Sequence, residues 1–462
     1  MTDLTGVLAR LDAAEADTRA RYFELLRIPS VSAQPPHAAD CRRTAEWLSR
    51  ELAELGFESG VRDTAGHPVV VAHHPGPEGA KGPHLLYYGH YDVQPAEPLE
   101  LWSSPPFEPT VVPGPHGDRV VARGAVDDKG QVMTWLSAFR AWHAETGSMP
   151  TRISVLVEGE EEVGSPSLDA FLEANAAELK ADLVVVSDTN MWDFDTPALS
   201  TRLRGLLYTQ IDLRAASRDL HSGMYGGSAR NPLNLLARIL GELHDAEGRI
   251  QLPGFYDGVP PVSNAQAAQW DSLGFDEARY LGDVGLSVPV GERGYGALER
   301  IWARPTCDVN GMWGGYTGEG SKTVIAAEAH AKVSFRLVGT QDPKAIAASL
   351  KDFVEARLPQ DCAAEIQVFG AAPAVEVPAE SPAIAAASRA LEAEYGRAPA
   401  LVGCGGSIPV VESFRRILGM ETLLMGFGLD DDQVHSPNEK FEWRCLTRGA
   451  RAHARLLGEL AK

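Results

Sequence analysis

Four short apolar runs, rich in β-branched and aromatic residues, most constrain the fold of this chain. They cover residues 84–89, 153–159, 183–187 and 423–427. Apolar runs of this length are typical of strands that are buried on both faces of a parallel sheet. Helical patterns separate them, and the clearest one places apolar side chains on one helix face over residues 129–142. This alternation predicts an α/β fold.

A second pattern interrupts the first in the middle of the chain. With 462 residues, the chain exceeds what one hydrophobic core usually supports. Residues 199–375 predict strand, helix, two strands, helix and strand, which is the order of a ferredoxin-like module. The Gly- and Pro-rich residues 251–304 inside it predict no regular elements. We therefore expect a first domain formed by residues 1–198 and 376–462, split by an inserted α+β domain of residues 199–375.

Composition excludes several classes of protein. The net charge of −21 argues against nucleic-acid binding, which depends on clustered Lys and Arg. The five cysteines are odd in number and far apart, a pattern typical of reduced thiols rather than a disulfide framework. No secretory signal or membrane-length apolar run is visible. We expect a cytoplasmic protein that binds neither nucleic acid nor a membrane.

Side chains of the types that bind metal ions lie where the apolar runs end or a helix begins. They are His90, Asp127, Glu162, Asp188 and His435. In open α/β sheets, sites assemble beyond the carboxyl ends of the strands, so these side chains are expected to converge. Two imidazoles among several carboxylates suit zinc or related divalent ions, and an Asp able to bridge suggests two ions.

Each of these features also has an ordinary structural explanation. His90 and Asp92 fit a histidine at a strand end beside a turn, and Asp127 fits the N-terminal cap of a helix. Three successive glutamates at residues 160–162 repel one another unless a cation is present, but they equally fit a solvated turn. Lone histidines in loops, such as His221, are more often unremarkable than catalytic. Taken singly, none of these motifs decides the function.

Taken in order, the motifs resemble the M20 metallopeptidase family, most closely its carnosinase-like dipeptidase branch. The resemblance covers nearly the whole chain. The matching segments are residues 89–95, 123–130, 158–164, 187–188, 219–227, 320–325, 334–337, 405–409 and 435–440. It implies a zinc-peptidase-like α/β catalytic domain with an inserted ferredoxin-like domain that serves as lid and dimerisation surface.

The resemblance also implies the roles of residues at a dinuclear centre. Its metal ligands would be His90 and Asp188 for one ion, Glu162 and His435 for the other, and Asp127 for both. Asp92 would orient His90, and Glu161 would be the general acid/base acting on a metal-bridging water. The peptide bond after Asp127 is expected to be cis, as in relatives. The ions would be zinc or manganese, with cobalt as a third option.

For the substrate, the resemblance implies a small peptide and a homodimer. His221 would reach the active site of the partner subunit and support the developing oxyanion. Residues matching those that hold the substrate's carboxylate end are Thr323, Arg336, Gly406 and Ser407.

The chain departs from the dipeptidase pattern at the end of the site that would receive a free amine. Cys404 stands where relatives commonly carry an acidic residue, and no His lies near Gly370 and Ala371. We predict a dipeptidase of broad specificity. An N-acyl-amino-acid deacylase or desuccinylase remains the alternative among enzymes, and a catalytically silent binding protein the alternative outside them.

Overall fold

The computed structural model describes residues 4–406 and 408–462. These residues form two compact units. The first contains residues 4–201, 377–402 and 409–462, and the second contains residues 202–376 and the described part of 403–408. No helix in the described ranges has both the length and the apolar character that crossing a membrane requires.

The first unit is built on one mixed sheet with the order β1-β2-β6-β3-β7-β17-β8. The strands are β1 (Glu58–Arg62), β2 (Val69–His74), β3 (Leu85–His90), β6 (Ile153–Glu158), β7 (Leu183–Val186), β8 (Ala198–Leu203), β16 (Ala400–Cys404) and β17 (Glu421–Leu424). The four strands in the middle, β6, β3, β7 and β17, are mutually parallel. Strands β3, β6 and β7 coincide with three of the apolar runs, whereas β17 begins before the fourth run and overlaps it only at residues 423–424. The predicted parallel core is confirmed.

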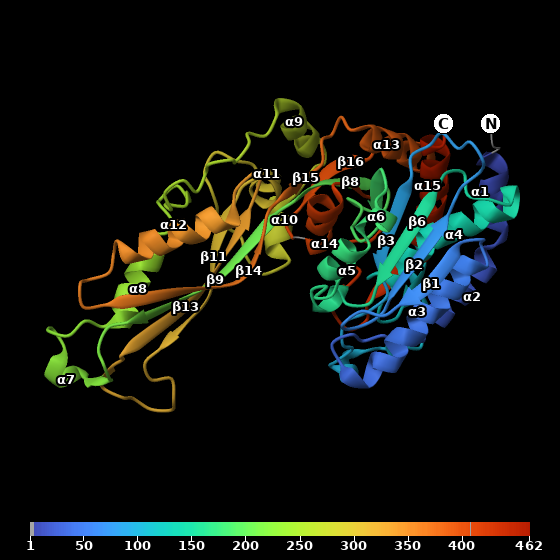
Figure 1. Cartoon of the computed structure of the whole chain (residues 1–462). Helices are drawn as coiled ribbons and strands as arrows, with labels where there is room; N and C mark the ends of the chain where they lie inside the picture. Colours follow the sequence, from blue (N-terminus) through green and yellow to red (C-terminus); the bar gives the residue numbers. More distant parts are fainter. Residues whose placement is uncertain (1–3, 407) are drawn as a thin grey trace. The chain divides into compact units, whose positions relative to one another are not determined.

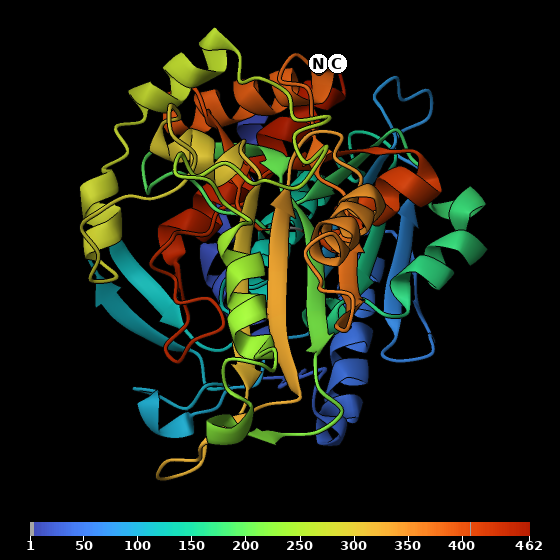
Figure 2. The ribbon, with the colours of Figure 1, turned by 90° about the vertical axis from the view of Figure 1, so that its left-hand side faces the viewer.

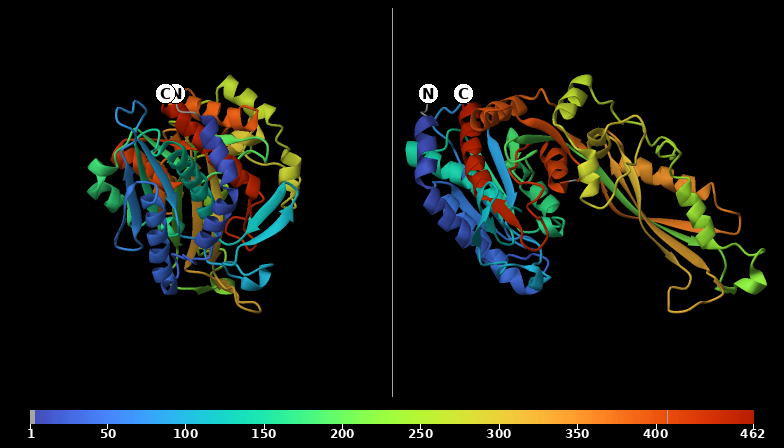
Figure 3. Two further views of the ribbon diagram at one scale, coloured as in Figure 1. Left: turned by 90° about the vertical axis from the view of Figure 1, so that its right-hand side faces the viewer. Right: turned by 180° about the vertical axis from the view of Figure 1, so that it is seen from behind.

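Helices cover both faces of this sheet. Tyr87 of β3 packs against Phe139 with ring centroids 4.9 Å apart, whereas the next residue, Tyr88, packs against Phe414 at 5.3 Å. Because successive side chains of a strand point to opposite faces, the two tyrosines define two helical layers. In the right-hand view of Figure 3, the blue helices and the red C-terminal helix lie in front of the sheet.

The layer on the Tyr87 side is the larger one. Its helices are α1 (Leu4–Ala13), α2 (Glu15–Leu26), α3 (Ala38–Ala53), α4 (Lys129–Thr146), α13 (Pro382–Tyr395) and α15 (Trp443–Leu460). On the other side lie α5 (Leu168–Ala174), α6 (Ala176–Leu179), α14 (Pro409–Ser413) and the π-helical turn Phe414–Leu418. A three-stranded sheet of β4 (Thr110–Gly114), β5 (Gly117–Val121) and β18 (Lys440–Glu442) completes the unit.

The second unit is an antiparallel sheet with the order β11-β13-β9-β14. Its strands are β9 (Gly205–Arg214), β11 (Thr306–Gly314), β13 (Glu328–Leu337) and β14 (Ala363–Ala372). Helices α8 (Pro232–Gly241) and α12 (Pro343–Glu355) cover one face, onto which Figure 2 looks. This arrangement confirms the predicted ferredoxin-like module. Short strands β10 (Leu220–His221) and β12 (Val324–Ile325) pair beside it, with α7 (Ser222–Tyr225) following β10.

The Gly- and Pro-rich stretch contains helices that the sequence did not predict. They are α9 (Asn264–Ser272), α10 (Glu277–Gly282) and α11 (Ala297–Trp302). Side chains that cap two of them satisfy free backbone N–H groups: Ser263 accepts from Gln266, and Asp276 accepts from Arg279. Such short helices lack the long apolar period on which the prediction depended.

Candidate metal centre

His90 and Asp127 form the buried half of a cluster beyond the carboxyl ends of the parallel strands. His90 is the last residue of β3 and is fully buried. Its Nε2 lies 3.0 Å from Oδ1 of Asp127 and 3.9 Å from Oδ2 of Asp188, which follows β7. The loop that carries Asp127 precedes α4, and the Asp127–Asp128 peptide bond is cis, as the resemblance implies.

Asp127 also faces the second half of the cluster. Its other oxygen, Oδ2, lies 3.0 Å from Nε2 of His435, and the same nitrogen lies 3.2 Å from Oε2 of Glu162. Thus one carboxylate lies between two imidazoles, with one oxygen toward each. The five predicted metal ligands come together as two groups that share Asp127.

The donor set fits divalent cations. Within each group the nearest ligand atoms all lie within 4.8 Å of one another. Nε2 of His90 is buried and has no hydrogen-bond partner of adequate geometry among the described residues, although carboxylates surround it. A buried polar atom without a partner lowers the stability of the fold. An imidazole nitrogen among carboxylate oxygens is a ligand set that zinc and manganese bind.

The pKa values of the cluster also indicate that it needs nearby positive charge. Burial, followed by the charge of Asp127, raises the pKa of Asp188 to about 8. Hydrogen bonds to Asp127 and Glu162 raise the pKa of His435 to about 10. Crowded carboxylates disfavour their own ionised forms unless positive charge is nearby. Without bound ions, protons on these side chains provide the positive charge. Bound cations would displace those protons.

Glu161 and Asp92 flank the cluster. Glu161 begins a short 3-10 turn, Glu161–Val163, and its burial raises its pKa above the ordinary value. The Asp92 carboxylate accepts the backbone N–H groups of Glu161 at 3.2 Å and Glu162 at 3.1 Å, and its Oδ1 lies 3.5 Å from Nδ1 of His90. The shorter contact of that nitrogen, 3.1 Å, is to the Asp92 backbone carbonyl. Asp92 therefore links the strand-end histidine to the glutamate turn.

Two further residues hold the ligands, although the sequence analysis gave neither a role. Gln94 donates from Nε2 to Oε2 of Glu162 at 2.7 Å. Glu439, four residues after His435, accepts the backbone N–H of Asp127 at 3.1 Å. Their separation from their partners, 68 and 312 residues, explains why no local sequence pattern reveals these contacts.

In the second unit, His221 and Thr323 are neighbours. The register of β10 and β12 places His221 opposite Val324, and Ser222 donates its N–H to the Thr323 carbonyl at 3.0 Å. His221 is exposed, and its Nδ1 accepts the N–H of Gly223 at 3.0 Å. Because Nδ1 is an acceptor, the neutral ring carries its proton on Nε2, which is then a hydrogen-bond donor.

Arg336 lies in the same unit beside a second arginine that the sequence analysis missed. Leu206 pairs with Arg336, so Arg204, two residues earlier, lies on the same side of the strands as a diagonal neighbour. Burial and the charge of Arg336 lower the pKa of Arg204 to about 10. Nε of Arg204 donates to the Gly405 carbonyl at 3.0 Å, and a Cβ on Gly405 would lie 3.1 Å from its Nη2.

These contacts place Arg204 against the glycine-rich segment that contains Gly406, with Arg336 as the neighbour of Arg204. Ser407, which follows Gly406 and is also predicted to bind substrate, lies outside the described residues. The charge of Asp308 acts on Arg204 but affects its pKa less than burial and Arg336 do. Two neighbouring guanidinium groups suit an anionic group of a ligand.

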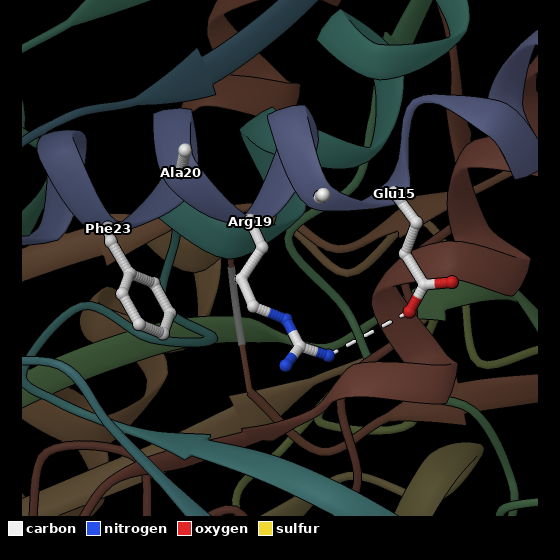
Figure 4. Close-up of a pocket in the computed structure, with 5 residues that line it drawn as sticks. Glu15, Arg19, Ala20 and Phe23 are labelled. Atoms are coloured by element: carbon white, nitrogen blue, oxygen red, sulfur yellow. Dashed lines mark ion pairs between the residues drawn. The ribbon is translucent and has the colours of Figure 1, made fainter.

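A hollow elsewhere in the first unit does not share this chemistry. It measures about 540 Å³ and is lined by Glu15, Ala16, Arg19, Ala20 and Phe23 of α2 (Figure 4). Arg19 lies 3.8 Å from Glu15. No predicted site residue lines it, so the metal-type cluster remains the candidate site.

A parallel sheet with histidines and carboxylates beyond its strand ends defines an α/β metallohydrolase. Residues 86–459 match the model of Peptidase family M20/M25/M40. Since this match spans most of the chain, the protein belongs to the M20 family of metallopeptidases. The predicted family and the predicted class of enzyme are confirmed.

Individual relatives cover almost the whole chain. A Cys-Gly metallodipeptidase of Schizosaccharomyces pombe is 31% identical over 467 residues, which cover 98% of this chain and 97% of the relative. The crystal structure of human carnosine dipeptidase 1 is 27% identical with a TM-score of 0.77, covering 99% of this chain and 98% of that one. An M20 family metallo-carboxypeptidase of Sulfolobus solfataricus is 30% identical with a TM-score of 0.81, covering 96% and 99%. The zinc-peptidase-like fold with an inserted lid domain is therefore confirmed.

Proposed function

We propose that this protein is a metal-dependent dipeptidase that hydrolyses the amide bond of small peptides with a free amino terminus. The observation that carries the proposal is the pair of ligand groups that share Asp127. The relatives that span nearly the whole chain include a Cys-Gly dipeptidase and a carnosine dipeptidase. A deacylase is not favoured by these comparisons, and Cys404 alone does not outweigh them.

The five ligands divide between two ions in this proposal. His90 and Asp188 would hold one, Glu162 and His435 the other, and Asp127 both. When bound, two divalent ions supply Lewis acidity, which polarises a carbonyl and makes water a stronger nucleophile at neutral pH. Zinc and manganese suit this set of nitrogen and carboxylate donors, and cobalt is expected to substitute for them.

Glu161 is the general acid/base of the proposed reaction. A carboxylate with a raised pKa can accept a proton from the attacking water and return it to the leaving amine. Asp92 is proposed to set the position of Glu161, because it binds the backbone N–H of that residue, as well as to orient His90. The Asp92 carboxylate thus connects the base to a metal ligand.

Residues of the second unit are proposed to bind the carboxylate end of the substrate. Arg336 can form two parallel hydrogen bonds with a carboxylate, and Arg204 adds a second positive charge beside it. Thr323, Gly406 and Ser407 are proposed to complete this subsite. A carboxylate subsite restricts the substrate to peptides that end shortly after the scissile bond.

We also propose that the protein is a homodimer in which His221 serves the partner's site. Support comes from the exposed position of His221 and from the tautomer that the Gly223 N–H selects. An Nε2–H donor aimed at a developing oxyanion typically contributes roughly 3–4 kcal/mol to transition-state binding. The proposed compartment is the cytoplasm, which suits the buried free thiols of Cys41, Cys307 and Cys445.

A substrate panel tests the proposed function. The protein is freed of metal, reloaded with zinc or manganese, and assayed against free-amine dipeptides, N-acetyl- and N-succinyl-amino acids, and longer peptides. The proposal expects turnover of the dipeptides. Turnover of the N-acylated compounds alone would replace the dipeptidase with a deacylase, and release of single residues from longer peptides would indicate a carboxypeptidase.

A further inference from the structure

The carboxylate of Glu439 binds the turn that carries Asp127 and is fully buried. Its Oε1 accepts the backbone N–H groups of Val126 at 2.9 Å and Asp127 at 3.1 Å. Its Oε2 accepts the backbone N–H of Gly124 at 2.8 Å and Nη1 of Arg123 at 2.7 Å. One side chain thus binds the whole turn that presents Asp127.

Glu439 belongs to a different loop, the one that carries His435. Its backbone carbonyl accepts the N–H of Ala122 at 3.1 Å, so the two loops are joined through main chain as well as side chain. The carboxylate therefore fixes the distance between the loop of Asp127 and the loop of His435. These two residues face each other at 3.0 Å.

The backbone conformation of the loop of His435 depends on contacts with other parts of the chain. Gln433, His435 and Asn438 all have positive φ, at 55°, 62° and 66°. Residues other than glycine disfavour this conformation, and it persists only where surrounding contacts impose it. Asn438 supplies one such contact, because its Oδ1 accepts the Ser103 N–H at 2.7 Å. Glu439 supplies the other contact, on the side that faces Asp127.

All four groups that face the Glu439 carboxylate are donors. A carboxylate can accept from every one of them, whereas a glutamine amide must turn its NH₂ group toward two N–H donors. Substitution by glutamine keeps the size of the side chain, but the glutamine NH₂ group would then face N–H groups that it cannot accept from. The charge of Arg123, which is buried with Glu439, would also lose its partner.

We propose that Glu439 is a positioning residue of the metal centre, which holds the loops of Asp127 and His435 together so that both side chains could bind the same ion. This inference rests on the proposed dinuclear function. Groups that orient metal ligands in this way typically change metal affinity by about 10–100-fold when they are replaced. Glu439 itself is not one of the five proposed ligands, because its carboxylate accepts hydrogen bonds from four protein donors.

The test measures metal affinity in purified full-length protein. Metal-free wild type, Glu439→Gln and Glu394→Gln are titrated with zinc against a chromophoric chelator, and the cobalt-loaded forms are compared by visible absorption. Glu394 is the matched control because it also pairs with arginines, Arg451 and Arg455, through a poorly accessible carboxylate. Glu439→Gln is expected to weaken zinc binding by about 10–100-fold and to alter the cobalt spectrum.

The control separates positioning from general stability. Both variants are expected to unfold at lower temperature, but Glu394→Gln should keep wild-type zinc affinity and the wild-type cobalt spectrum. Folded Glu439→Gln with unchanged affinity and spectrum would overturn the inference.

A second variant keeps the inference testable if Glu439→Gln does not fold. Glu439→Asp retains the charge beside Arg123 but is one methylene shorter, so it cannot reach all four donors at once. It is expected to weaken zinc binding in the same direction by a smaller factor. Unchanged affinity in this variant would count against the inference. Failure of wild type to bind zinc would instead refute the dinuclear function itself.

Discussion

At the scale of single residues, Asp127 is the pivot of the site. Its two oxygens each lie 3.0 Å from a different imidazole, and its loop is held from below by Glu439. His90, His435 and Glu439 all lie far from it in sequence. The proposed proton transfer depends on Glu161, which precedes the ligand Glu162 and is not itself a ligand.

Glu161→Gln is expected to abolish most turnover without loss of the ions. A glutamine cannot accept the proton of the attacking water, so kcat should fall by about 10²–10⁴-fold. The measurement pairs dipeptide hydrolysis with the metal content of the same sample by elemental analysis. Glu160→Gln is the matched control, because Glu160 accepts the N–H of His67, which a glutamine can also do. Full activity of Glu161→Gln would remove this residue from the mechanism.

His453 is expected to make the fold sensitive to acid. Burial lowers the pKa of this histidine from 6.5 to about 3. The unfolded chain therefore binds a proton between these values while the folded one does not, so stability is complete above pH 6.5 and falls as the pH decreases below it. At pH 5 the loss amounts to about 2 kcal/mol.

Urea unfolding of wild type and His453→Gln at pH 7 and pH 5 measures this effect. A glutamine can still bond to Ser187, which lies 2.9 Å from Nε2 of His453, but it does not titrate. The decrease in unfolding free energy between the two pH values should be smaller in the variant by about 2 kcal/mol. An equal decrease in both proteins would show that His453 is not the responsible group.

The residue scale also shows what a sequence can and cannot reveal. His90 and Asp188 were predictable because each follows a recognisable apolar run. Glu439 and Arg204 were not, because their partners are set by folding: Glu439 meets Asp127 across 312 residues, and Arg204 meets Gly405 across 201. Only three-dimensional contact assigns a role to such residues.

At the scale of elements, α4 and the turn before it pack closely against each other. Gly130, the second residue of α4, lies so close to this turn that a Cβ would fall 1.9 Å from the carbonyl oxygen of Ala125. The helix start and the loop of Asp127 can therefore pack only with a glycine at this position. Sequence patterns predicted the helix, but not this contact, because it depends on the path of the preceding loop.

Gly130→Ala should therefore displace the turn and weaken the site. Overpacking of this kind typically costs about 1–3 kcal/mol of stability, and the shift of Asp127 should reduce zinc affinity as well. Gly241→Ala, at the end of α8, is the control, since a Cβ there meets nothing within 4 Å. The control is expected to be neutral or slightly stabilising, by about 0.4–1 kcal/mol. Equal unfolding temperatures and zinc affinities for Gly130→Ala and wild type would contradict the argument.

At the scale of the whole molecule, the proposed dimer predicts that two inactive variants can complement each other. If His221 acts in the partner's site, Glu161→Gln and His221→Ala damage the same site from different chains. A heterodimer of the two variants then contains one site in which both residues are intact.

Coexpression of the two variants with different affinity tags tests this prediction. Each variant alone should be nearly inactive. Random pairing should leave about a quarter of all sites intact and restore about a quarter of the wild-type activity. The purified mixed dimer should retain about half of its sites intact. A mixed dimer without activity would contradict the role of His221 in the partner's site, and a strictly monomeric protein in light scattering would contradict the dimer.

In the proposed reaction, two groups of ligands that share Asp127 would hold two ions, and the enzyme would hydrolyse a free-amine dipeptide. The most direct test titrates the metal-free protein with zinc or manganese while dipeptide hydrolysis is followed. We expect no turnover without metal and a rise in activity that saturates at about two ions per chain. Turnover by the metal-free protein, or full activity with one ion, would contradict it.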